Sequence, residues 1–135
     1  MALSLIDSSV WIDWFRGVDS KATEELAQLI RYPLSIATTQ PVLMELQAGA
    51  RTVELVKISR IVNSFTMLDV DASIDFVRAA DIFRAVRAKG HTPRALLDCL
   101  IAAVALRREA VLVHKDIDFD RIAEVVPALQ VRSLI

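Results

Sequence analysis

Short apolar runs alternate along this chain with longer segments in which apolar residues recur at helical spacing. That alternation is typical of an α/β domain, in which helices cover a parallel sheet. The apolar runs predict strands at 3–6, 34–37, 65–70, 111–113 and 129–133. The segments of helical period predict helices at 9–15, 20–31, 38–49, 53–63, 71–89 and 92–108. We therefore expect an α/β fold with a mainly parallel sheet.

Length and composition limit the class of protein. At 135 residues and 15.0 kDa, the chain has the size of one ordinary domain, so we expect a single domain over 1–135. Hydrophobic residues make up 54% and charged residues 24%, a composition that excludes a disordered chain. The core should therefore be sizeable.

Two features argue against export or insertion into a membrane. The mean hydropathy is +0.42, yet every apolar stretch is broken before the ~18 residues that a spanning helix needs. The first residues, MALSLID, lack the basic region of a secretory signal.

Cys99 is the single cysteine, which excludes an internal disulfide and a multi-cysteine zinc site. We expect a cytoplasmic protein with no membrane contact.

The charge is almost balanced. Sixteen basic and 17 acidic residues give a formal net charge of −1. No global positive field would attract nucleic acid, so any nucleic-acid chemistry must depend on a local patch or a bound metal.

Four acids from distant parts of the sequence are predicted to lie at one edge of the sheet. Asp7 directly follows the first strand and Asp116 closely follows the fourth. Open α/β sheets bind ligands at this edge, beyond the carboxyl ends of the strands. Glu45 lies in the first turns of the helix after the second strand, and Asp98 lies early in a late helix. The alternatives are ordinary: Asp7 can cap the next helix, and Glu45 can be a solvated helix acid.

Asp98 is the most informative of these acids. The other eleven residues of 95–106 are all apolar, so the helix should be buried nearly all round. A buried carboxylate without a partner costs several kcal/mol, so something must compensate Asp98. A helix N-terminus, an arginine or a metal ion could each do so. Carboxylates gathered at one rim favour Mg²⁺ or Mn²⁺, which can lower the pKa of a bound water for attack on phosphorus.

Four motifs in order resemble the PIN-domain nucleases, and within them the VapC toxins of bacterial toxin–antitoxin pairs. They are Asp-Ser-Ser-Val-Trp-Ile-Asp, Pro-Val-Leu-Met-Glu-Leu, Leu-Leu-Asp-Cys-Leu-Ile-Ala-Ala and His-Lys-Asp-Ile-Asp-Phe-Asp-Arg-Ile, which together span nearly the whole chain. The resemblance implies a three-layer α/β/α sandwich and a metal-dependent endoribonuclease that uses Mg²⁺ or Mn²⁺ and a metal-activated water. It also implies a homodimer and inhibition by a cognate VapB-like antitoxin.

The resemblance carries roles onto individual residues. Asp7, Asp98 and Asp116 would hold the metal, and Glu45 would hold it or position the attacking water. Asp118 is an auxiliary fifth acid, and Ser8 matches a small hydroxyl position that would orient Asp7. His114 departs from the pattern, because many relatives have Ser or Thr there.

Other residues carry weaker signals. The densest basic stretch is either a solvated helix end or a contact for RNA or antitoxin, and it consists of Arg84, Arg87, Lys89, His91 and Arg94. His91 is interpreted as a loop residue and His114 as a packing residue. Trp11, Trp14 and Phe15 are interpreted as core rather than interface.

Other functions remain open at this point. A DNA-directed or structure-selective nuclease of the same fold would need a longer chain with extra loops. A Mg-binding phospho-signalling receiver would need paired acids after the first strand and a lysine after the last, and neither is evident. A catalytically dead interaction module would not need the full set of acids.

Overall fold

The computed structural model describes residues 2–135, which form five strands and seven α-helices. The strands are β1 (Ser4–Ile6), β2 (Ile36–Thr38), β3 (Thr66–Met67), β4 (Val111–His114) and β5 (Gln130–Ser133). The helices are α1 (Ser8–Phe15), α2 (Lys21–Ile30), α3 (Gln40–Gly49), α4 (Thr52–Ser64), α5 (Asp75–Ala88), α6 (Leu96–Arg107) and α7 (Ile117–Val125), with a 3-10 turn at Pro33–Ser35. None of the helices in 2–135 combines the length and apolar character that crossing a membrane would require.

The strands form one parallel sheet in the order β3-β2-β1-β4-β5. From β1 the chain first adds β2 and β3 on one side of the sheet and then β4 and β5 on the other, so the strand order reverses between β1 and β4. In open parallel sheets the crevice at such a switch point is where ligands bind. The Asp7 N–H donates to the Val113 carbonyl at 2.9 Å, which joins the ends of these two strands.

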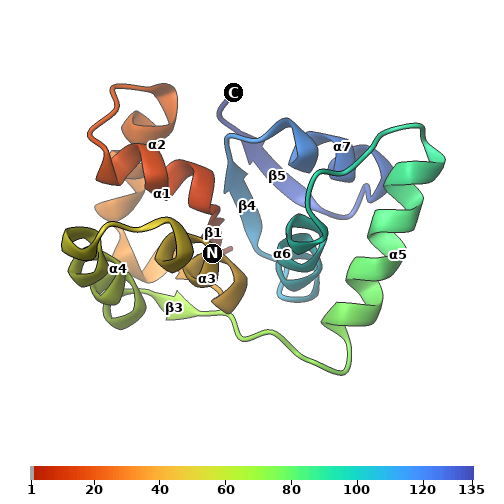
Figure 1. Cartoon of the computed structure of the whole chain (residues 1–135), viewed down its shortest axis with the longest axis horizontal. Helices are drawn as coiled ribbons and strands as arrows, with labels where there is room; N and C mark the ends of the chain where they lie inside the picture. The colour runs from red at the N-terminus through yellow and green to blue at the C-terminus, as the bar shows by residue number, and fades with distance from the viewer. Residues whose placement is uncertain (1) are drawn as a thin grey trace.

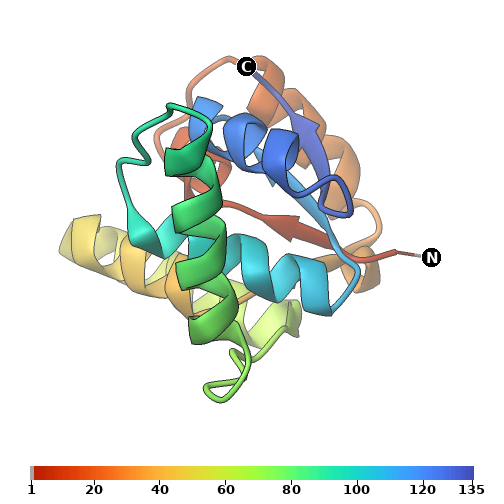
Figure 2. The same ribbon diagram turned by 90° about the vertical axis from the view of Figure 1, so that its right-hand side faces the viewer.

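Helices lie on both sides of the sheet, as the α/β/α prediction requires. Figure 1 shows α1 to α4 on the left and α5 to α7 on the right, with β1 and β4 between them. Helix α5 packs across α6, as the turned view in Figure 2 also shows. The core includes Leu5 and Ile6 of β1, Leu112 of β4 and a run of fully buried residues on α6. Helix α6 is buried nearly all round, as its apolar sequence predicts.

The second and third strands differ most from the apolar runs that predict them. The second begins at Ile36 rather than at 34, because Pro33 starts a 3-10 turn in which the Ser35 hydroxyl donates to the Tyr32 carbonyl at 2.7 Å. The third ends at Met67 rather than at 70. Beyond it, the Val70 N–H donates to a side chain, Gln40 Oε1, at 3.0 Å instead of to a neighbouring strand.

The helices differ from the prediction mainly at their ends. Ser20, where the predicted helix 20–31 begins, is the N-cap of α2 and forms a capping box with Thr23. Helix α5 begins at Asp75 rather than at 71, and α6 begins at Leu96 rather than at 92. Helix α7 has no counterpart in the predicted elements. It follows Asp116 directly, and that residue is its N-cap.

Candidate active site

Two of the predicted acids lie side by side at the ends of β1 and β4, and both cap helices. Asp7 Oδ2 accepts the Ser9 N–H at 3.0 Å at the start of α1. Asp116 Oδ1 accepts the Asp118 N–H at 3.0 Å at the start of α7. Each carboxylate uses one of its two oxygens to cap its helix, so Asp7 and Asp116 can cap helices and also take part in a binding site.

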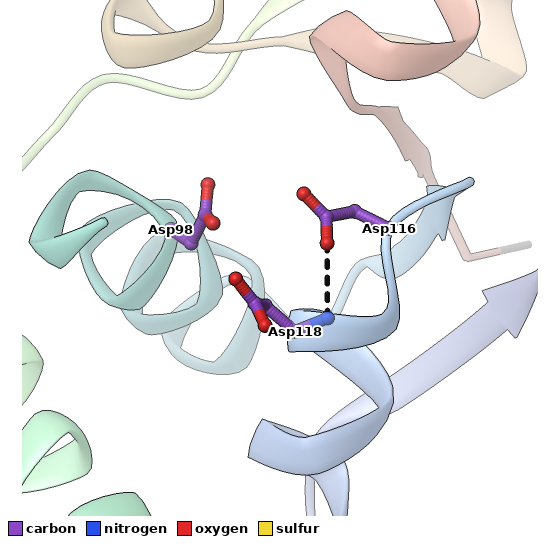
Figure 3. Close-up of side chains that lie close together, drawn as sticks. All are labelled: Asp98, Asp116 and Asp118. Carbon is purple, nitrogen blue, oxygen red and sulfur yellow. Dashed lines mark hydrogen bonds between the residues drawn. The ribbon is translucent and has the colours of Figure 1, made fainter. Parts of the chain in front are cut away.

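Asp98 lies opposite them, in the first turn of α6. Its carboxylate points toward those of Asp116 and Asp118, as Figure 3 shows. Oxygen atoms of these three residues lie within 4.8 Å of one another. Asp98 is 7% exposed, and among the described residues no cation contacts it. Burial, and then the negative charges of Asp7 and Asp116, raise its pKa to about 8.

Glu45 approaches the same place from α3. It is half-buried, and its Oε1 accepts a hydrogen bond from the Ser8 hydroxyl at 3.2 Å. Burial, followed by the charge of Asp7, raises the pKa of Glu45. Burial also raises the pKa of Asp7, although hydrogen bonds from Ser9 oppose the shift. The structure therefore brings together Asp7, Glu45, Asp98, Asp116 and Asp118.

The hydroxyl that orients Asp7 belongs to Ser9, not to Ser8. Ser9 Oγ donates to Asp7 Oδ2 at 2.6 Å and accepts the Lys115 N–H at 3.1 Å, which ties the loop after β1 to the loop after β4. Ser8 donates to Glu45 instead, which corrects the expectation drawn from the resemblance. The sequence signal for Ser9 is a hydroxyl two residues after a strand-end acid, a common capping arrangement.

His114 supports Asp116 from the core. It is fully buried, and its Nδ1 accepts the Asp116 N–H at 3.1 Å. Burial lowers the pKa of His114, which favours the neutral ring, and Nε2 lies 3.1 Å from Asp120 Oδ1. The Ser133 hydroxyl donates to the other Asp120 oxygen at 3.0 Å. The packing interpretation of His114 therefore holds, and His114 also fixes the backbone of an acid in the site.

The basic stretch divides into two parts. Arg84, Arg87 and Lys89 are exposed near the end of α5. Arg94 lies apart from them on the loop before α6. Its Nη2 donates to Asp116 Oδ1 at 2.7 Å and its Nε donates to Asp118 Oδ2 at 3.0 Å. Arg94 therefore pairs with Asp116 and Asp118 of the candidate site, a contact that sequence spacing alone could not predict.

Two buried oxygens in the site, Asp7 Oδ1 and Asp118 Oδ1, have no hydrogen-bond partner within residues 2–135, although Asp118 Oδ1 lies 3.6 Å from Arg121 Nη1. Buried carboxylate oxygens without a donor are costly unless a cation compensates them. All the groups available here are oxygens, which suit a hard divalent ion such as Mg²⁺ or Mn²⁺. The donor set therefore fits a metal ion, and the three acids whose oxygens lie within 4.8 Å of one another include Asp118 rather than Asp7.

The aromatic residues near α1 are only partly in the core. Trp11 is 2% exposed and lies against Phe15 and Phe65, with ring centroids 6.0 and 5.7 Å apart. Trp14, in contrast, is 37% exposed and lines a surface groove of about 310 Å³ together with Trp11 and Phe15. The expectation of a core role was therefore wrong for Trp14.

Comparisons with known proteins agree with this geometry. The family model described as "PIN domain" matches residues 4–125. Ribonuclease VapC11 of Mycobacterium tuberculosis is 43% identical over 123 residues, which cover 90% of this chain and 92% of the relative. A VapC ribonuclease of Mycobacterium bovis matches equally well.

Solved structures share the fold at lower identity. The DNA-bound VapBC complex of Salmonella typhimurium contains a chain with a TM-score of 0.76 and 21% identity, and the match covers 100% of both chains. VapBC2 of Rickettsia felis, bound to a promoter DNA fragment, gives a TM-score of 0.75 at 22% identity over 98% of this chain and 99% of that one. At this identity the likeness supports the fold alone.

Proposed function

The chain belongs to the PIN-domain family, and from that premise we propose that it is a metal-dependent endoribonuclease and the toxin of a type II toxin–antitoxin pair. The observation that carries the proposal is the meeting of carboxylates from β1, α3, α6 and the β4–α7 turn at one sheet edge. The VapC ribonucleases that match most of the chain support RNA as the substrate. An RNA substrate in turn favours the cytoplasm, and we treat 1–135 as one nuclease domain.

Asp98, Asp116 and Asp118 would hold a Mg²⁺ or Mn²⁺ ion, with Asp7 at its edge. When bound, such an ion supplies positive charge that lowers the pKa of a water and stabilises the leaving oxygen. The protein's part is to keep the acids in place. Asp7 and Asp116 are fixed by the caps of α1 and α7, and Asp98 is fixed by the buried helix α6.

Glu45 is the group best placed to act on the attacking water. It comes from a different element than the other acids, and Ser8 holds one of its oxygens. Without metal, burial and the charge of Asp7 raise the pKa of Glu45 above its ordinary value, which favours its acceptance of a proton. No histidine is free to do this work in the described site, since the buried His114 ring is occupied with Asp116 and Asp120.

An antitoxin would cover the groove that Trp14 lines. Its walls combine aromatic residues with two cations, and they include Trp11, Trp14, Phe15, Lys57, Arg60 and Phe65. An apolar helix or strand with acidic residues fits such a surface. The VapBC complexes among the structural neighbours support a partner of this kind. The exposed residues Arg84, Arg87 and Lys89 remain candidates for contact with RNA or antitoxin.

A second copy of the chain would cover the junction of α5 and α6. Phe76 and Leu96 are 55% and 56% exposed there, and they line an apolar hollow of about 290 Å³ with Ala80 and Leu100. An exposed apolar patch rarely stays uncovered on a soluble monomer. Phe76→Glu should therefore convert a dimer to a monomer in light scattering.

The nuclease proposal is tested with the purified chain and a labelled RNA. We expect cleavage with Mg²⁺ or Mn²⁺, products with 5′-phosphate and 3′-hydroxyl ends, and no cleavage by Asp98→Asn. Cleavage that persists in excess EDTA, or 2′,3′-cyclic phosphate ends, would overturn metal dependence. A preference for DNA over RNA at equal length would favour the DNA-directed alternative.

A further inference from the structure

Arg94 spans two carboxylates of the candidate site. Its Nη2 donates to Asp116 Oδ1 at 2.7 Å, and its Nε donates to Asp118 Oδ2 at 3.0 Å. The backbone N–H of Arg94 points to the same Asp118 oxygen at 3.4 Å. One guanidinium therefore binds both acids that flank the start of α7.

These two acids also belong to the group of three that fits a cation. Oxygen atoms of Asp98, Asp116 and Asp118 lie within 4.8 Å of one another. A guanidinium and a divalent ion would use oxygens of the same carboxylates, and two positive charges so close together repel each other. Arg94 and a metal ion therefore compete for this place.

The Arg94 side chain is also able to move away from Asp116 and Asp118. Its side chain is 68% exposed, whereas that of Asp118 is 3% exposed. The residue lies on the loop between α5 and α6 and not in a helix. A bound metal ion would supply the positive charge that Arg94 now gives to the buried Asp118, so rotation of the Arg94 side chain into solvent would not leave that carboxylate unpaired. The acid, in contrast, cannot move away, because it is in the first turn of α7.

We infer that Arg94 is a built-in counter-cation: it holds Asp116 and Asp118 while no metal is present, yields to the metal, and then binds a phosphate of the RNA. The inference rests on the proposed metal-dependent ribonuclease function. Arginine suits the second task because its planar guanidinium offers paired donors to a phosphate. The released side chain starts from the rim of the site, where the RNA backbone must pass.

The first measurement is Mn²⁺ affinity by calorimetric titration of wild type and Arg94→Gln without RNA. We expect Mn²⁺ to bind the variant roughly fivefold more tightly or better, because a competing charge has been removed. The matched control is Arg108→Gln, which removes the same charge from an exposed residue at the opposite end of α6. Its affinity should equal that of wild type.

The second measurement is RNA binding at saturating Mn²⁺, with Glu45→Gln in both proteins to prevent cleavage. We expect Arg94→Gln to weaken RNA binding and to lower the slope of its salt dependence by about one. Opposite effects on metal and RNA distinguish this role from a structural one. A residue that merely held the loop would weaken both when removed, and a thermal melt identifies a variant that fails to fold.

Two results would overturn the inference. One is a folded Arg94→Gln that binds Mn²⁺ with equal or lower affinity than wild type, and the other is an unchanged RNA salt slope. A different result would overturn the proposed function itself, namely that wild type binds no more Mn²⁺ than Asp98→Asn does. Arg94→Lys provides a further test, since it keeps the charge but loses the paired donors, and it should retain competition with Mn²⁺ better than RNA affinity.

Discussion

Asp98 is a carboxylate that destabilises the element on which it lies when no cation is bound. It is almost fully buried, it faces other acids, and its pKa is raised to about 8. Between its ordinary pKa and about pH 8, the folded chain keeps a proton that the unfolded chain releases. Stability without metal therefore falls as the pH rises through this window.

Asp98→Asn removes this penalty. At pH 8 without metal we expect the variant to be more stable than wild type, by on the order of 2 kcal/mol, and the difference should shrink as the pH falls toward 4. Mn²⁺ should stabilise wild type more than the variant. Urea unfolding at several pH values measures both effects.

The control for this experiment is Asp81→Asn, which removes an exposed carboxylate from α5. The free energy of unfolding of Asp81→Asn should change with pH in the same way as that of wild type across this range. A loss of stability in Asp98→Asn at pH 8 would mean that the Asp98 carboxylate has a stabilising partner, and it would contradict a metal-site role.

Ser8 and Ser9 are adjacent hydroxyls with separate tasks. The Ser9 hydroxyl links Asp7 to the backbone of Lys115, while the Ser8 hydroxyl donates to Glu45. We expect Ser9→Ala to cost about 1 kcal/mol of stability and to weaken Mn²⁺ binding, since Asp7 loses a donor while buried. Ser8→Ala should keep Mn²⁺ affinity and lower kcat.

The two serine variants serve as controls for each other. Thermal melts, Mn²⁺ titration and single-turnover cleavage should be measured on both. Equal losses of Mn²⁺ affinity in the two variants would contradict the division of tasks.

At the scale of elements, a buried ion pair fixes the junction between α5 and α6. Asp75 is fully buried, and Arg107 donates to both of its oxygens at 2.9 Å. Burial raises the pKa of Asp75, but hydrogen bonds from Arg107 and from the Asp71 backbone outweigh it and hold the pKa below its ordinary value. The stability this pair supplies is therefore present above the ordinary carboxyl pKa and is lost in acid.

Arg107→Met should lower the free energy of unfolding by about 3 kcal/mol, because Asp75 stays buried without its cation. Adding Asp75→Asn should recover part of that loss. Urea unfolding at pH 7 of the two single variants and the double variant gives the coupling energy. If the double variant is no more stable than Arg107→Met, the unpaired charge is not the cause.

Element order and type could largely be predicted from the sequence, because apolar runs and helical periods differ in spacing. The ends of the strands and helices could not be predicted, since side chains distant in the sequence determine them. Gln40 and Arg107 take the backbone groups of residues 69–70 that a longer third strand would need. Asp118 holds Arg94 outside α6. Helix α7 was missed because it is short and because Asp118 and Asp120 interrupt the apolar pattern of its first turn.

At the scale of the whole molecule, the gathering of acids could be predicted because strand ends of a parallel sheet meet at one edge. Asp7 and Asp116 follow from that rule alone. The close contact of Asp118 with Asp98 could not be predicted, because it depends on the undetected turn into α7. Nor could the place of Arg94, whose partners lie 22 and 24 residues away.

The near-neutral chain should bind RNA through local cations only. Replacing Arg84, Arg87 and Lys89 by Gln should weaken RNA binding and lower the salt slope by about 2, if each of them contacts a phosphate. The matched control replaces three exposed residues and so reaches the same net charge. They are Lys21 at the start of α2, Arg31 just after it and Arg108 just after α6. Filter binding over a range of salt concentrations compares the two.

An unchanged slope in the first triple variant would remove this end of α5 from the RNA surface. Antitoxin binding should be measured on the same proteins. A loss confined to the antitoxin would assign these residues to that partner.

The order of the strands has a consequence for the synthesis of the protein on the ribosome. Strand β1 is made before β4, and Asp7 lacks the end of β4 beside it until that strand is made more than 100 residues later. Contacts of such long sequence separation form late. A nascent chain that has not yet reached β4 therefore carries Asp7 without Asp116 and Asp118, and we expect it to leave its own messenger RNA uncut until β4 and α7 have been made.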